Sequence, residues 1–65
     1  MSESDKRTII AYADNDMNML QTAYSMNMTV GGVKYRLKQI ARRTKYNPFK
    51  FYDLIELLRK AGKSI

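Results

Sequence analysis

The sequence predicts a compact all-α domain of about four helices, organised around a helix-turn-helix, and two patterns lead to this prediction. Apolar residues recur at helical rather than alternating spacing along most of the 65-residue chain. Asn and Thr residues stand in front of these stretches, at the positions where helices are capped. A chain of this length holds one small core, so residues 1–65 are expected to form a single domain.

Capping residues mark the first two helices. The first helix is expected over about residues 5–13, with Ser2 or Ser4 as its N-cap. After a turn, Asn18 is the expected N-cap of a short helix over about residues 18–25, in which a Gln three positions further on completes a capping box.

Residues 18–44 have the pattern of a helix-turn-helix. Small Ala23 permits the close crossing of two helices, and Asn27 is able to adopt the left-handed conformation of a tight turn. The third helix is expected from Thr29, its N-cap, to about Thr44. Its apolar stripe consists of Val30, Val33, Leu37, Ile40 and Ala41.

The fourth helix is expected over about residues 48–61, with Asn47 and Pro48 as its start signal and Gly62 as its stop signal. Its normal core stripe consists of Phe51, Leu54, Ile55 and Leu58. The apolar surface is widened beyond one face by Phe49, Tyr52, Leu57 and Ala61. A helix that is apolar around most of its circumference is buried on more than one side, which predicts a homodimer or another protein partner at this surface. The alternative is that the first helix covers it within one chain.

The composition argues against an enzyme and against a bound cofactor or metal. The chain has no Cys and no His, which removes disulfides, the usual zinc ligands and the usual nucleophile–base pairs. No apolar run is long enough to span a membrane, and the acidic N-terminus is unlike a signal peptide. A cytoplasmic protein is therefore expected.

Basic charge is concentrated in the second half of the chain. Of the formal net charge of +6, residues 1–33 contribute −2 and residues 34–65 contribute +8. If Val33 and Leu37 face the core, the outward positions of the third helix are Tyr35, Lys38, Gln39 and Arg42. Its flanks are Lys34, Arg36 and Arg43. This basic face predicts contacts with the phosphates of duplex DNA, although a merely solvated helix face would carry similar charges.

The same segment resembles a known family of DNA-binding modules. The residues that carry the resemblance are Asn18, Thr22, Ala23 and the run Tyr35-Arg36-Leu37, followed by Ile40 and Thr44. Their spacing is similar to that of the C-terminal helix-turn-helix of PucR-type transcription regulators, which is related to the Fis-type fold. The run Val30-Gly31-Gly32-Val33-Lys34, followed by Arg36 and Leu37, is similar to the promoter-reading helix of sigma factors. The resemblance extends over about residues 8–58.

This resemblance implies that the start of the third helix enters the major groove. The base-contacting positions of these families correspond to Thr29, Val30, Gly32 and Tyr35. PucR-type proteins usually carry Arg-Asn-Thr where this chain has Val30-Gly31-Gly32, and bidentate recognition of a base needs Arg, Lys, Asn or Gln. Sparse readout of bases is therefore expected.

Together these features predict a small, homodimeric, DNA-binding transcription regulator, and its length suggests a phage or another mobile element as its origin. The alternative is a protein-interaction module with weak DNA affinity, such as an antirepressor or a protein that binds RNA polymerase or another regulator. Its partner would then dock on the C-terminal helix.

Overall fold

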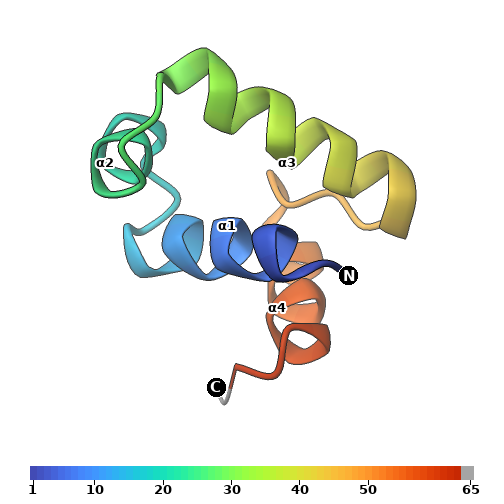
Figure 1. Ribbon diagram of the computed structural model, residues 1–65. Helices are drawn as coiled ribbons and strands as arrows, with labels where there is room; N and C mark the ends of the chain where they lie inside the picture. Colours follow the sequence, from blue (N-terminus) through green and yellow to red (C-terminus); the bar gives the residue numbers. More distant parts are fainter. Residues whose placement is uncertain (64–65) are drawn as a thin grey trace.

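The computed structural model describes residues 1–63, which form four α-helices and no strand. The helices are α1 (Glu3–Asp14), α2 (Met19–Ser25), α3 (Val30–Thr44) and α4 (Phe51–Lys60). The helix α1 contacts the other three, and α2 also contacts α3. Figure 1 shows α3 on one side of α1 and α4 on the other. The predicted all-α fold of four helices is confirmed.

Side-chain caps begin three of the four helices. In each, the side-chain oxygen of the cap accepts a hydrogen bond from the backbone N–H three residues further on. The caps are Ser2, Asn18 and Thr29, with donor–acceptor distances of 3.1, 2.9 and 3.0 Å. Of the two serines considered for the first helix, the structure therefore selects Ser2.

The turn between α2 and α3 is formed at Asn27. This residue has a φ of 55°, in the left-handed region, as the sequence predicted. The next residue, Met28, donates its backbone N–H to the carbonyl of Ala23 at 2.9 Å. In Figure 1, α2 is seen end-on while α3 is seen from the side, so the two axes cross steeply. Ala23 is buried at this crossing, and the segment is a helix-turn-helix.

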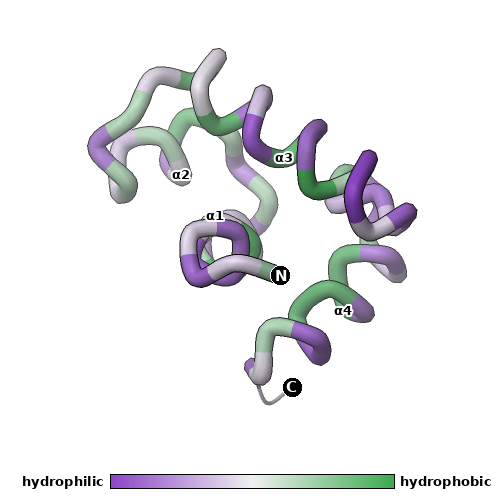
Figure 2. The backbone as a smooth tube through the Cα atoms, turned by 45° about the vertical axis from the view of Figure 1, so that its right-hand side comes forward, coloured by the Kyte–Doolittle hydropathy of each residue, from purple (hydrophilic) through white to green (hydrophobic). Residues whose placement is uncertain are grey.

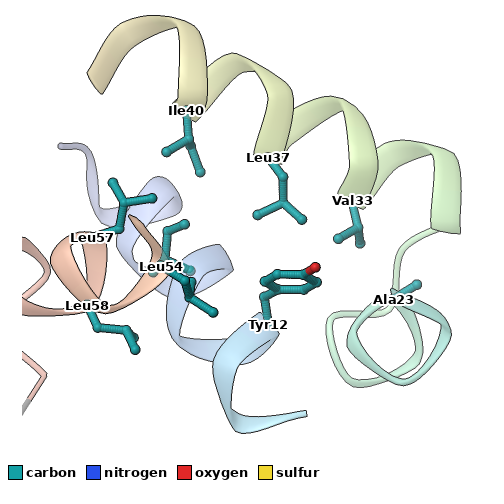
Figure 3. Packing of buried hydrophobic residues seen from close by; sticks show 9 residues of the cluster. Tyr12, Ala23, Val33, Leu37, Ile40, Leu54, Leu57 and Leu58 are labelled. Carbon is teal, nitrogen blue, oxygen red and sulfur yellow. The ribbon is translucent and has the colours of Figure 1, made fainter. Parts of the chain in front are cut away.

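The core lies beneath α3 and is built from all four helices. Figure 3 shows Val33, Leu37 and Ile40 pointing from one face of α3 toward Tyr12 of α1 and Leu57 of α4. Burial raises the pKa of the Tyr12 phenol, because the ionised form would be poorly solvated there. Figure 2 shows the same division along α3, which is apolar toward the core and hydrophilic away from it.

Within residues 1–63, no helix is long and apolar enough to cross a bilayer.

The fourth helix begins at Phe51, three residues later than the sequence analysis expected. The side-chain Oδ1 of Asn47 accepts a hydrogen bond from the Phe49 N–H at 2.9 Å. The backbone N–H of Asn47 donates to Asp53 Oδ2 at 3.0 Å. These two bonds hold the segment in a turn, and Pro48 is buried within it. An Asn-Pro pair fits such a turn as well as a helix start, so the expected start at Pro48 was wrong.

The wide apolar surface of α4 is divided between the core and solvent. Leu57 is fully buried, so its expected role in contacting a partner was wrong. The other helices of the same chain cover this side chain. Phe51, expected in the core, is instead 59% exposed. Tyr52 is 82% exposed. Phe49 and Ala61 are half-buried, and the Phe49 ring meets an aromatic ring of α1 edge-on at a centroid distance of 6.2 Å.

Candidate nucleic-acid interface

The face of α3 that points away from the core is exposed and basic. Tyr35, Lys38 and Arg42 follow one another at helical spacing, and all three are exposed. Tyr35 is 65% exposed, so its ring and its hydroxyl are open to a partner. We call these three residues the outer face of α3. Since helix-turn-helix proteins dock through their second helix, this face is the candidate interface.

The ion pairs of the described residues lie away from this face. The ion pairs formed within residues 1–63 are Glu3–Lys6, Asp5–Arg43, Asp14–Lys63 and Glu56–Arg59. None of them involves Lys34, Lys38, Arg42 or Lys45, all of which are exposed. The positive charges along the outside of α3 are therefore not neutralised by the part of the chain that the structure describes.

Two of the predicted DNA-binding residues are tied to α1 instead. Arg43 Nη2 donates to both carboxylate oxygens of Asp5 at 2.7 Å, and Arg36 donates to the Ser4 hydroxyl. The Asp5 side chain is only 13% exposed, so solvent screens its attraction to Arg43 less than that of a surface pair. Both arginines therefore lie on the flank of α3 that faces α1, in agreement with their predicted flanking positions, and they link the two helices.

The N-terminal end of α3 offers little to a DNA base. The Thr29 Oγ1 atom accepts the Gly32 N–H as the helix cap, which leaves mainly its O–H as a single donor. Val30 is exposed and presents only methyl groups. Further along, Lys34 is exposed on one flank, and Gln39 is half-buried beside the outer face.

The two glycines of α3 have different surroundings. A Cβ on Gly32 would lie 3.1 Å from Thr29 Oγ1 and 3.2 Å from Met28 Cε. A Cβ on Gly31 would meet nothing within 4 Å. The glycine that faces open space is therefore Gly31, whereas the sequence analysis had selected Gly32 as a DNA-contacting position.

This difference predicts that alanine is tolerated better at Gly31 than at Gly32. Gly31→Ala is expected to stabilise the domain by up to about 1 kcal/mol, because it gains helix propensity without a steric conflict. Gly32→Ala gains the same propensity, but Thr29 and Met28 must move, so its stability should fall below that of Gly31→Ala. Urea denaturation followed by circular dichroism measures both variants. Equal stabilities would contradict the crowding at Gly32.

An open hollow adjoins the outer face at the C-terminal end of α3. Its lining includes Lys38, Arg42 and Lys45 from the helix and its cap, together with Asn47 and Phe49 from the link to α4. Neither Lys45 nor Asn47 is among the candidate site residues predicted from the sequence. Lys45 follows Lys38 and Arg42 at helical spacing, directly after the end of α3 at Thr44, where the sequence had also predicted the end of this helix.

Comparison of the chain with models of protein families, with curated proteins and with solved structures finds no match. The resemblance to PucR-type regulators and sigma factors therefore rests on the residues quoted above. The class defined by the fold is a four-helix domain that contains a helix-turn-helix.

Proposed function

We propose that the protein binds duplex DNA with the outer face of α3 in the major groove and acts in the cytoplasm as a small transcription regulator. The observation that carries the proposal is the position of exposed Tyr35, Lys38 and Arg42 on the second helix of the helix-turn-helix. Within residues 1–63, no ion pair engages either cation. Lys and Arg contacts with phosphates supply a large part of the affinity of proteins for DNA.

Discrimination between DNA sequences is expected to be weak. At the N-terminal end of α3, Val30 can contact a thymine methyl group, and Tyr35 offers a single hydroxyl. Gln39 beside the outer face could pair with adenine in a bidentate manner, but it is half-buried, and we assign Lys38 and Arg42, which could otherwise recognise guanine, to phosphates. Affinity should therefore come mainly from the DNA backbone, which is the same for every sequence.

The test is fluorescence anisotropy of the purified protein on labelled duplexes across a series of salt concentrations. We expect the logarithm of the binding constant to fall linearly with the logarithm of salt concentration, with a slope of about −4 for four neutralised phosphates. Random and promoter-derived duplexes should bind with similar affinity. The proposal is rejected if no binding is measured at about 0.1 M salt, where surface charges still act over about 10 Å.

Self-association through α4 is a second candidate function, and it is favoured by an exposed aromatic pair. The Phe51 and Tyr52 rings meet edge-on with centroids 5.5 Å apart, and both are largely exposed. Phe51 also lines an apolar groove between α4 and the α1–α2 link, together with Met17 and Ile55. Exposed apolar patches are typical of interaction surfaces, which supports this candidate function.

We propose that a second copy of the chain occupies this patch. Charges of both signs lie around it, with Asp16 lining the groove and Lys50 immediately before Phe51. In a two-fold pair the same patch meets itself, and mixed charges avoid the repulsion that a rim of one sign would cause. Within residues 1–63, this groove shares no lining residue with the hollow that adjoins the outer face of α3, so a partner at this patch is expected to leave that face uncovered.

A further inference from the structure

The hollow at the C-terminal end of α3 combines three cations with a hydrogen-bond donor. Lys38, Arg42 and Lys45 line it at helical spacing, and Asn47 lines it from the link to α4. Among residues 1–63, no acidic side chain lines it. All three cations line the same open space, so an anion placed there is attracted by each of them.

Asn47 is held in place by its own backbone hydrogen bonds. Its Oδ1 accepts the Phe49 N–H at 2.9 Å, and its backbone N–H donates to Asp53 Oδ2 at 3.0 Å. The Nδ2 group makes no hydrogen bond within residues 1–63. The side-chain oxygen is therefore engaged by a backbone group, and the Nδ2 group remains as a hydrogen-bond donor on a residue that lines the hollow.

Lys45 stands at a position where glycine is the usual residue. It is the C-cap of α3, with a φ of 69° and a ψ of 6°, and its backbone N–H donates to the Ala41 carbonyl at 2.9 Å. Glycine would make the same hydrogen bond without the crowding that Cβ experiences in the left-handed region. The chain thus accepts local strain at a residue whose side chain lines the hollow, and strain at one residue is a reason to look for a function of its side chain.

We propose that this hollow binds a backbone phosphate of duplex DNA, which is held by Lys45 and the Asn47 Nδ2 group beside Lys38 and Arg42. The proposal rests on the function proposed above, in which α3 docks on duplex DNA. It adds a specific binding site for one phosphate of the DNA backbone. Positive charge and a neutral N–H donor are the groups that commonly contact phosphate oxygens. A contact of this kind fixes the position of the protein on DNA and is independent of base sequence.

Lys45→Gly separates the effect of Lys45 on stability from its effect on DNA binding. The substitution should raise the stability of the domain and lower its affinity for DNA. Removing the left-handed strain should raise the Tm of the domain by roughly 5 °C. Losing one phosphate contact should weaken binding to a labelled duplex roughly eightfold at about 0.1 M salt and reduce the salt slope by about 1. The loss should be the same on duplexes of different sequence. Lys45→Asn, which also tolerates the left-handed region, should weaken binding equally.

Arg59→Gln is the matched control, because it lowers the net charge by the same amount on α4, where Arg59 pairs with Glu56. It should bind DNA within about twofold of the wild type, as expected for a cation outside the interface. A more stable Lys45→Gly variant that binds DNA with the affinity and salt slope of the wild type would contradict the proposed phosphate-binding site. If Lys38→Gln weakens binding in that same series, duplex binding by α3 still stands. Failure of the wild-type protein to bind duplex DNA would instead overturn the proposed function itself.

Discussion

Replacing Leu57 with alanine is expected to remove most of the stability of this domain. Leu57 is fully buried between the helices, and a buried Leu→Ala change typically costs about 2–5 kcal/mol. A chain of 65 residues has a free energy of unfolding of only roughly 3–10 kcal/mol. Urea denaturation followed by circular dichroism should therefore show a large fall in the transition midpoint, or a chain that is already unfolded without urea.

Tyr52→Ala is the matched variant on the same helix. Tyr52 is 82% exposed, so its loss should change the free energy of unfolding by no more than about 0.5 kcal/mol. Sedimentation equilibrium should show weaker self-association for this variant if a second copy covers the exposed aromatic pair. The reverse pattern, a stable Leu57→Ala protein with impaired association, would contradict the burial of Leu57 and restore it to the interface.

The elements of the fold were predictable where the signals are local. The caps at Asn18 and Thr29 and the left-handed turn at Asn27 depend on residues only a few positions apart, and all three are confirmed. The start of α4 was not predictable in the same way. Asn-Pro is compatible with either a helix start or a turn, and the outcome depends on Asp53 reaching back six residues to the Asn47 backbone.

The orientation of α3 was also predictable, because Val33 and Leu37 fix which of its residues point outward. The partners of its flanking arginines were not. Arg36 and Arg43 meet α1 residues that are 32 and 38 positions away in the chain, so their contacts depend on how the helices pack. For the same reason, the spacing of apolar residues on α4 could not decide which of them α1 and α3 would cover.

The largest effect on DNA binding is expected from reversing both charges of the outer face of α3. In Lys38→Glu/Arg42→Glu, two phosphate contacts are lost and two carboxylates face the DNA backbone. Two lost contacts alone correspond to roughly a sixtyfold weaker affinity at about 0.1 M salt, and repulsion adds to this loss. The loss should be similar on every duplex, because phosphates carry no sequence information. Anisotropy titrations on several duplexes measure both effects.

The control for this variant is Arg59→Glu/Lys60→Glu, which makes the same change in net charge on exposed residues of α4. Circular dichroism must first show that both proteins remain folded, since Arg42→Glu places a negative charge in the last turn of α3 at a cost of about 0.3–1 kcal/mol. If binding depends only on the overall charge of the protein, the two variants lose affinity equally, and the outer face of α3 is not the interface. A much larger loss for the α3 variant identifies that face as the DNA-binding surface.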